Sequence, residues 1–397
     1  MVEQERREKR EERREKRDTT LHCSALHSHV MRFGQVILGA AGAGKTTYCR
    51  GAQHFLELQG RDCLVVNLDP ANDTYEYECA LDVRDLVCAR QVEEEYKLGP
   101  NGALVFCMEY LEKNVDWLQE GLLEIHKQQH AKEDKKKEKE EEKVEEEDGG
   151  GDGGSSSGGL QLDESDLYVV LDCPGQVELF ATHGSFRRIL SVLEKELGFR
   201  FACVHCVDVQ LCSDANNYMA AIMLSLNVML NLELPHVNVL TKCDMMKRLG
   251  HFEMPFDYYL DAQNLQHLLI SGDDNKKQQQ GGGSSRTLDP KFYRLTEGLC
   301  ELLEDFALVN FIPVAIEDGR SLNRLVKMID KCLGYVPSIP ATSTQGPMSA
   351  SEERQAFIES LDQATSVDAL GSMDWQEHFL NFDLSKKTTA NDSLHSK

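Results

Sequence analysis

The chain has 397 residues, a net charge of −24 and 41% hydrophobic residues. This length allows one large domain or two average ones, and the hydrophobic fraction is ample for a packed core. The acidic balance argues against an extended surface for nucleic acid or an anionic membrane, and no apolar run reaches the roughly 18 residues of a membrane span. We therefore expect a globular protein that contacts neither nucleic acid nor a membrane directly.

Residues 1–30 are predicted to be a charged N-terminal extension. Glu alternates with Arg and Lys over residues 1–18, which is typical of a solvated helix with i,i+4 ion pairs. A nuclear-localisation signal is the weaker alternative. The charged start differs from the apolar core of a signal peptide, and the interleaved Glu residues differ from a transit peptide. With no such signal, the 13 Cys residues indicate reduced thiols and a cytosolic protein.

The stretch Gly39–Thr46 matches the P-loop pattern G-x-x-x-x-G-K-[ST] without a gap. An apolar run that predicts a strand precedes it, and a predicted helix begins near Thr46, which makes a chance glycine-rich turn the poorer alternative. Such a loop directs several backbone N–H groups at one phosphate, and the helix N-terminus adds partial positive charge there. The Lys side chain is expected to reach the β- and γ-phosphates and the Thr hydroxyl to bind Mg²⁺. The predicted nucleotide-binding residues of this loop are Gly42, Ala43, Gly44, Lys45, Thr46 and Thr47.

Apolar runs alternate with helical stretches through much of the chain. Continuous apolar strands with helical crossovers predict a mostly parallel sheet with helices on both faces, the α/β P-loop NTPase class. Ligands of such sheets bind at the carboxyl ends of the strands, where the motifs below fall. The predicted strands are Val36–Leu38, Cys63–Leu68, Tyr168–Leu171, Phe201–Val207, Val237–Leu240 and Phe311–Ala315.

Cys203 and Cys206 form a C-x-x-C pattern inside one predicted strand. Residues three apart on a strand face opposite sides of it, so these thiols are not expected to share a metal or form a disulfide. Two other segments, about 127–165 and 274–285, are too polar and too low in complexity to join a core. We predict one domain over 31–337 with these disordered insertions, and a largely disordered tail over 338–397 with an amphipathic segment near Glu352–Leu361.

Carboxylates follow two of the predicted strands. Asp69 precedes Pro70 after one strand and would approach Mg²⁺ or the attacking water; the alternative is an ordinary turn Asp. Asp172 ends another strand, as a Walker B carboxylate that holds the Mg²⁺ shell does. It also begins the Asp-x-x-Gly pattern of GTP switches, in which the Gly175 N–H bonds the γ-phosphate. Gln176 and Glu178 follow closely enough to orient a water.

The sequence Thr241-Lys242-Cys243-Asp244 at a further strand end is the [NT]-K-x-D base-recognition pattern. Its Asp carboxylate accepts hydrogen bonds from N1–H and N2–H₂ of guanine, donors that adenine lacks. The Lys stem is expected to pack along the base. After the last predicted strand, the backbone amide at Ala315 is expected beside the base. The predicted nucleotide is therefore GTP or GDP.

The chain resembles the GPN-loop GTPases over about residues 31–337. The resemblance is carried by Gly99-Pro100-Asn101, by Asn67–Ala71 upstream and by the motifs above in family order. Within the family, the segments at 77–80, 234–236 and 256–259 look most like paralogue 2. The resemblance implies a SIMIBI-type dimerising GTPase in which the Asn of the GPN loop contacts the phosphates in the partner's site. It also implies catalytic roles for Asp69, Asp172, Gln176, Glu178 and Asn101.

The resemblance further implies a homodimer or a heterodimer with other GPN-loop GTPases. It implies a role in the assembly and nuclear import of RNA polymerase II and related polymerases, through contacts with polymerase subunits and assembly factors. A cytoplasmic protein that shuttles to the nucleus fits that role. Two alternatives remain at this point. One is a P-loop kinase acting on a small molecule or a polynucleotide, and the other is a non-catalytic adaptor with bound GTP.

Overall fold

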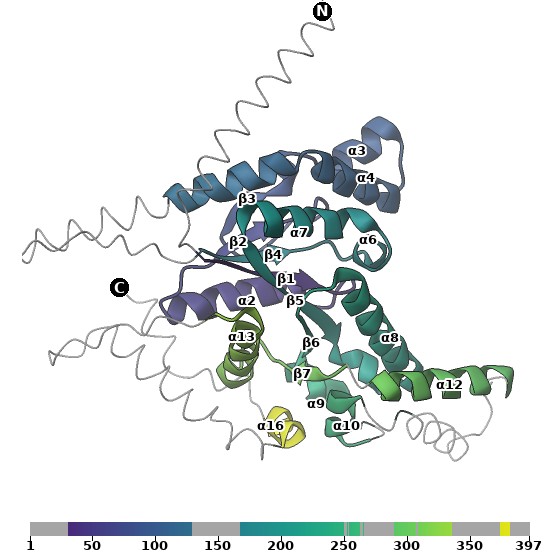
Figure 1. Cartoon of the computed structure of the whole chain (residues 1–397). Helices are drawn as coiled ribbons and strands as arrows, with labels where there is room; N and C mark the ends of the chain where they lie inside the picture. Colours follow the sequence, from purple (N-terminus) through teal and green to yellow (C-terminus); the bar gives the residue numbers. More distant parts are fainter. Residues whose placement is uncertain are drawn as a thin grey trace, which may run out of the picture.

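A single parallel sheet organises the part of the chain that the structure describes. The computed structural model describes residues 31–128, 167–249, 252, 254–262, 265, 290–306, 309–335 and 374–381. Within these ranges seven strands pair in parallel in the order β3-β2-β4-β1-β5-β6-β7 (Figure 1). The strands are β1 (Arg32–Leu38), β2 (Leu64–Asn67), β3 (Cys79–Asp82), β4 (Leu167–Asp172), β5 (Phe199–Asp208), β6 (His236–Thr241) and β7 (Phe311–Pro313).

The predicted α/β class and all six predicted strands are confirmed. The central strands are apolar because both faces of the sheet are covered, and every residue of β4 is buried. The strand that the sequence did not predict is β3, a four-residue edge strand whose residues are all half-buried. An edge strand this short carries too little apolar periodicity to be seen in the sequence.

Helices cover both faces of the sheet (Figure 1). One face packs against α2 and α13, and the other packs against α3, α4, a helical stretch over 115–128, α6, α7 and part of α8. A third core joins α8, α9, α10, α12 and α16 at the β7 edge. None of these described helices is long and apolar enough to cross a membrane. The helices are α2 (Lys45–Leu58), α3 (Ala89–Tyr96), α4 (Pro100–Lys113), α6 (Val177–Ala181), α7 (Gly184–Leu197), α8 (Ala215–Leu232), α9 (Met246–Leu249), α10 (Phe256–Asp261), α12 (Pro290–Phe306), α13 (Gly319–Leu333) and α16 (Trp375–Asn381), with 3₁₀ turns η1 (Val83–Asp85), η2 (Val209–Ser213) and η3 (Cys243–Met245).

The alternation of side chains along β5 places the two cysteines of the C-x-x-C pattern on opposite faces of the sheet. Cys203 lies in the core on the α4 and α7 side of the sheet, whereas Cys206 lies in the core on the α2 side. Both are free, buried thiols, and burial raises the pKa of Cys206 to about 12. The expectation that the two thiols do not share a metal or a disulfide is confirmed, because the sheet lies between them.

A short helix from the C-terminal region packs on the domain. Trp375 and Phe379 of α16 are buried at the β7 edge, and Gln376 accepts a hydrogen bond from the Phe256 N–H at 3.1 Å. The His378 ring lies 3.0 Å from the carboxylate of Asp318, the N-cap of α13. The tail therefore contains an ordered, docked helix that the sequence did not indicate.

Several segments named from the sequence lie outside the described residues. They are the charged extension over 1–30, most of the insertion at 127–165, the insertion at 274–285 and the amphipathic segment near Glu352–Leu361. Residues 127 and 128, the first of the predicted insertion, are still helical. The structure and the boundaries of these segments stay predictions from the sequence.

A buried imidazole lies in the core between β5 and α8. His205 is fully buried, and its Nδ1 lies 3.0 Å from the Ser225 hydroxyl. Its ring centroid is 5.8 Å from that of His236. Burial, with the neighbouring His236, lowers the pKa of His205 to about 3. The imidazole therefore stays neutral in the folded protein at pH values where the unfolded chain binds a proton.

Stability should therefore fall as the pH is lowered below about 6.5, the ordinary His value, because only the unfolded state takes up the proton. His205 alone is expected to lower the free energy of unfolding by up to about 1.4 kcal/mol per pH unit down to its folded-state pKa, and His236, whose pKa burial lowers to about 4, adds to the slope. Urea denaturation between pH 7 and pH 4 measures this slope. His205→Asn retains a polar group near Ser225 and should flatten the slope. His54→Asn, at an exposed position, should not, and equal slopes in both variants would contradict the assignment.

Candidate functional site

The predicted P-loop joins β1 to α2 at the carboxyl edge of the sheet. Three of its glycines have positive φ angles, 140° at Gly39, 77° at Gly42 and 90° at Gly44. A Cβ atom on Gly39 would lie 2.3 Å from the carbonyl oxygen of Cys206, so only glycine fits at that position. Gly44 is the N-cap of α2, which begins at Lys45. The helix N-terminus and the loop amides thus lie where the sequence predicted a phosphate site.

The loop after β4 packs directly against the P-loop. A Cβ on Gly175 would lie 3.0 Å from both the Ala41 Cα and the Lys45 amino nitrogen. Lys45 itself is buried, and its amino group donates to the Ala40 carbonyl at 3.3 Å. The predicted phosphate lysine and the predicted γ-phosphate amide are therefore neighbours in space, although 130 residues separate them in sequence.

Asp172 is the most buried carboxylate of the site. One carboxylate oxygen, Oδ2, accepts hydrogen bonds from the Thr46 hydroxyl at 2.9 Å and from the Tyr77 hydroxyl at 3.0 Å. The other oxygen, Oδ1, is buried and has no hydrogen-bond partner among the described residues. Burial raises the pKa of Asp172, and the bonds from Thr46 and Tyr77 oppose that rise. A buried carboxylate oxygen that accepts no hydrogen bond from the described residues is a suitable ligand for a hard cation.

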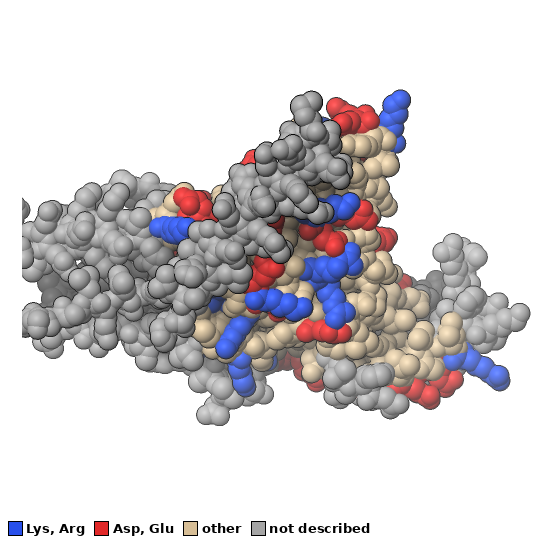
Figure 2. Space-filling model, turned by 45° about the horizontal axis from the view of Figure 1, so that its top comes forward, with Lys and Arg blue, Asp and Glu red and all other residues tan. Residues whose placement is uncertain are grey.

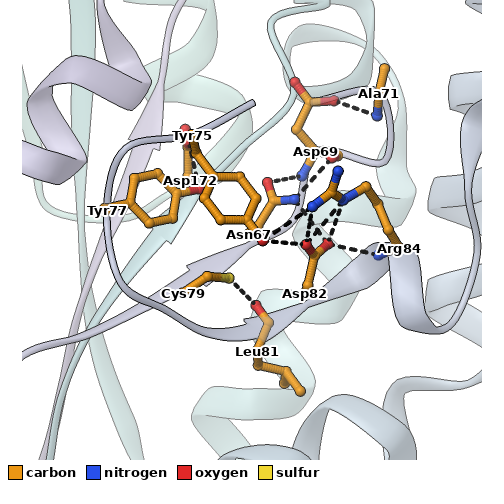
Figure 3. Close-up of polar contacts among 10 residues, drawn as sticks. All are labelled: Asn67, Asp69, Ala71, Tyr75, Tyr77, Cys79, Leu81, Asp82, Arg84 and Asp172. Carbon is orange, nitrogen blue, oxygen red and sulfur yellow. Dashed lines mark hydrogen bonds and ion pairs between the residues drawn. The ribbon is translucent and has the colours of Figure 1, made fainter. Parts of the chain in front are cut away.

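Asp69 lies in the segment after β2, with its side chain directed toward Ala71 (Figure 3), and its charge contributes to raising the pKa of Asp172. Its Oδ1 accepts from the Ala71 N–H at 3.0 Å, and its backbone is bonded to the Asn67 side chain. Burial raises the pKa of Asp69, while the N–H of Ala71, the charge of Lys45 and the N–H of Gly175 oppose that rise. The turn-forming role that the sequence left open is thus real, and the same carboxylate lies close to the P-loop lysine.

The Gly99-Pro100-Asn101 segment begins a helix. Gly99 is the N-cap of α4 and Pro100 is its first residue, a position that suits proline because it needs no N–H donor. Asn101 is exposed, and its side-chain oxygen accepts a hydrogen bond from Gln176 of the same chain. Gln176 is the residue before α6, and Glu178 lies in the first turn of that helix. The structure therefore brings the GPN residues to the edge of their own chain's site.

The base-recognition motif is tied to the P-loop from the other side. The Thr241 hydroxyl donates to the Ala43 carbonyl at 2.7 Å, and the Lys242 amino group donates to the Gly42 carbonyl at 2.6 Å. Lys242 also forms a 2.6 Å ion pair with Asp208 at the end of β5. Asp244, in η3, is half-buried, and no hydrogen bond or ion pair holds its carboxylate among the described residues. This carboxylate is available to a ligand.

The segment after β7 supports the same motif. The Val314 N–H donates to the Leu240 carbonyl at 2.8 Å, and the Cys243 N–H donates to the Val314 carbonyl at 3.3 Å. The Ala315 N–H points at the Ser321 hydroxyl, 3.3 Å away. A contact of that amide with a base, as predicted from the sequence, would therefore be shared with Ser321.

Sequence reasoning missed residues that contact the predicted ones. They are Tyr77 on Asp172, Asn67 on Asp69 and Asp208 on Lys242. The signal for Asp208 was present, because it ends a predicted strand as Asp172 does. No motif pointed to Tyr77 as a partner of Asp172, because 95 residues separate them and the contact depends on the path of the chain before β3.

On the face of the molecule shown in Figure 2, charges of both signs are interspersed among the described residues, and Lys and Arg side chains lie next to Asp and Glu side chains. Among the described residues, no group of three or more His, Cys, Asp or Glu side chains could hold a metal ion. A cation held by Asp172 and the Thr46 hydroxyl would therefore take its remaining ligands from a nucleotide and from water, as Mg²⁺ typically does.

Comparison with known proteins agrees with this geometry. A family model described as "Conserved hypothetical ATP binding protein" matches residues 37–137 and 157–335. The crystal structure of a GTPase in apo form from Pyrococcus abyssi matches with a TM-score of 0.51 and 22% identity, covering 75% of this chain and 96% of that one. At this identity the likeness speaks for the fold alone. Fold and site together define an α/β P-loop NTPase.

Curated relatives narrow this class. The chain is 40% identical over 306 residues to the GPN-loop GTPase QQT1 of Arabidopsis thaliana, covering 77% of this chain and 86% of the relative. It is 36% identical to GPN-loop GTPase 2 of Danio rerio, covering 77% and 82%, and 37% identical to GPN-loop GTPase 2 of Schizosaccharomyces pombe, covering 77% and 81%. The chain belongs to the GPN-loop GTPase family, and the predicted resemblance is confirmed.

Two glycines of the P-loop provide a matched pair for testing this geometry. Gly39→Ala should lower the free energy of unfolding by about 3 kcal/mol or more, because the new Cβ collides with backbone in addition to the positive φ. Gly42→Ala meets no atom within 4 Å and should cost only about 1–2 kcal/mol from its backbone conformation. Urea denaturation of both variants measures the difference. Equal losses would show that the approach of β5 to the loop is not as tight as described.

Proposed function

We propose that this protein binds GTP with Mg²⁺ and hydrolyses it as a molecular switch. The observation that carries the proposal is the joining of three sequence-distant motifs at one edge of the sheet. Thr46 of the P-loop bonds Asp172, and Thr241 of the base-recognition motif bonds the P-loop at Ala43. Membership of the GPN-loop GTPase family supports hydrolysis over a P-loop kinase or a non-catalytic adaptor.

Each part of the nucleotide has residues suited to it. The P-loop amides and Lys45 hold the phosphates, and the unpartnered Oδ1 of Asp172 with the Thr46 hydroxyl suits the shell of a magnesium ion. The ion would supply charge neutralisation between the β- and γ-phosphates. Gly175 lies against the Lys45 amino group, so its N–H is close enough to report whether a γ-phosphate is present. These roles give a switch that senses hydrolysis.

Water activation falls to side chains at the same edge. Asp69 has a pKa raised by burial, which makes its carboxylate a better acceptor for a proton or hydrogen bond from water. Gln176, the residue before α6, and Glu178, in the first turn of that helix, orient the nucleophile. Asn101 brings an uncharged amide to Gln176. Because an amide stabilises developing phosphate charge less than Arg does, slow turnover is the expected result.

The family resemblance supports a wider role. The protein acts as a homodimer, or as a heterodimer with another GPN-loop GTPase, in the assembly and nuclear import of RNA polymerase II and related polymerases. It works in the cytoplasm, shuttles to the nucleus, and contacts polymerase subunits and assembly factors. Mass spectrometry of proteins that co-purify with a GTP-locked form tests this role, and the absence of polymerase subunits from the bound fraction would count against it.

Guanine selectivity should reside in Asp244. Asp244→Asn replaces one of the two carboxylate oxygens that accept from N1–H and N2–H₂ with an NH₂ donor. GTP binding should therefore weaken by about 10-fold or more, and preference should shift toward xanthine nucleotides, which have a carbonyl where guanine has its amino group. Competition titrations with GTP, XTP and ATP measure the change. Asp261→Asn, in α10, is the matched control and should bind GTP as the native chain does. ATP binding as tight as GTP binding by the native chain would overturn the guanine assignment and agree with the ATP in the family model's description.

Asn101 has two alternative sites of action. In a dimer like those of its family it acts in trans, on the nucleotide of the partner subunit. If its contact with Gln176 of the same chain is the one used in hydrolysis, it acts in cis. Asn101→Ala should lower hydrolysis by about 10-fold or more while sparing GTP affinity, and Lys45→Ala should abolish GTP retention. A mixed dimer of these two variants contains one site with an intact P-loop and a partner with an intact Asn101. Recovery of hydrolysis in mixed dimers, measured as phosphate release, supports action in trans. No recovery in dimers shown to be mixed assigns Asn101 to its own chain's site.

A further inference from the structure

Asn67 occupies the last position of β2 and is fully buried. Strand register places it beside Asp172 on one neighbour and beside Asp82 on the other. Its side chain makes three hydrogen bonds. The oxygen accepts from the Asp69 N–H at 3.1 Å, and the amide group donates to the Asp69 carbonyl at 3.2 Å and to Asp82 Oδ1 at 3.0 Å. One amide thus bridges the edge strand β3 and the backbone of Asp69.

Asp82 is itself held from several directions (Figure 3). Its carboxylate accepts from the Arg84 guanidinium, with a shortest distance of 2.6 Å, from the Arg84 N–H at 2.9 Å and from the Tyr75 hydroxyl at 2.7 Å. Burial alone would raise the pKa of Asp82, but the bonds from Arg84, Tyr75 and Asn67 lower it to about 2. The carboxylate is therefore charged at any working pH and is a fixed acceptor for Asn67.

The same group of side chains reaches the second carboxylate of the site. The Tyr75 ring stacks on Tyr77 with centroids 4.7 Å apart and planes 10° apart, and the Tyr77 hydroxyl donates to Asp172. Tyr75 therefore touches both the residue that anchors Asn67 and the residue that bonds Asp172. Residues in and before β3 thus contact Asp172 directly and the backbone of Asp69 through Asn67.

We propose that Asn67 and Asp82 are positioning residues for GTP hydrolysis, which hold the Asp69 backbone so that its carboxylate stays aligned with the site. This inference rests on the proposed role of Asp69 in hydrolysis. Beyond the end of β2 the Asp69 backbone has no ladder of strand hydrogen bonds to fix it, and the Asn67 amide supplies an acceptor and a donor in their place. Asp82 in turn fixes the orientation of that amide, because a carboxylate accepts only from the NH₂ end.

The test uses a pair of isosteric exchanges. Asn67→Asp keeps an acceptor for the Asp69 N–H but removes both donated bonds and sets two carboxylates against each other. Single-turnover hydrolysis of bound GTP should fall about 10- to 100-fold, since small misplacements of a reacting group have effects of this size. Affinity for GTP should change less than about threefold, because the phosphate and base contacts lie elsewhere.

Combining this change with Asp82→Asn restores the hydrogen bond with its direction reversed. The amide introduced at position 82 donates to the carboxylate introduced at position 67. The double variant should therefore hydrolyse GTP faster than Asn67→Asp alone, by about the several-fold factor that one hydrogen bond supplies. Such a rescue is specific to a direct contact between the two positions, and a general loss of packing would make the double variant worse than either single one.

Two further variants complete the experiment. Asp73→Asn, which breaks an exposed ion pair with Arg90 in the same segment, should hydrolyse GTP as the native chain does. Asp69→Asn should abolish most hydrolysis. The inference is overturned if Asn67→Asp hydrolyses normally, if its rate and affinity fall together, or if the double variant shows no rescue. If Asp69→Asn retains full activity, the proposed role of Asp69 fails and the positioning role fails with it. If Asn67→Asp and the double variant hydrolyse GTP normally while Asp69→Asn does not, the positioning role fails and the proposed role of Asp69 stands.

Discussion

The parallel direction of the seven strands in the described part of the chain is the constraint on which the site depends. Because the strands point the same way, their carboxyl ends meet at one edge, and residues far apart in sequence become neighbours there. The register of β2 with β4 sets Asn67 beside Asp172, and that of β5 with β6 sets Asp208 beside Thr241. The P-loop leaves β1 in the middle of this row, so the predicted phosphate and Mg²⁺ residues lie in one half of the row and the predicted base-recognition residues lie in the other.

The two halves differ in how they are held. On the base side, Thr241 and Lys242 donate directly to carbonyls of the P-loop, so the base-recognition segment and the phosphate loop form one connected unit. On the catalytic side, Asp172 touches the P-loop through one hydroxyl, while Gln176 and Asn101 meet at the exposed end of α4. The half with more hydrogen bonds to the P-loop suits the proposed selection of the nucleotide, and the half with fewer suits the proposed response to the γ-phosphate.

Much of the fold and of the candidate site could be predicted, for identifiable reasons. Continuous apolar strands and a gapless P-loop are local patterns, and local patterns can be recognised in a single sequence. The contacts that the predicted residues make with distant partners could not be predicted. Tyr77 reaches Asp172 only because of the path that the chain takes between β2 and β3. The contact of Asn67 with Asp82 could not be predicted, because Asp82 lies on an edge strand too short to show periodicity. The helical start of the GPN segment was hidden because Gly-Pro-Asn-Gly equally suits a turn.

The docked helix α16 lies beyond residue 335, where the family model's match ends. It packs on α10, α9 and η3, and η3 carries the base-recognition carboxylate. His378 bonds the N-cap of α13, and Arg324 of that helix lies 5.0 Å from the centre of the Trp375 ring. Part of the packing behind η3 and its base-recognition motif thus comes from residues that lie outside the family model's match. Relatives that differ here are free to differ in how firmly that packing is held, with every nucleotide-contacting motif unchanged.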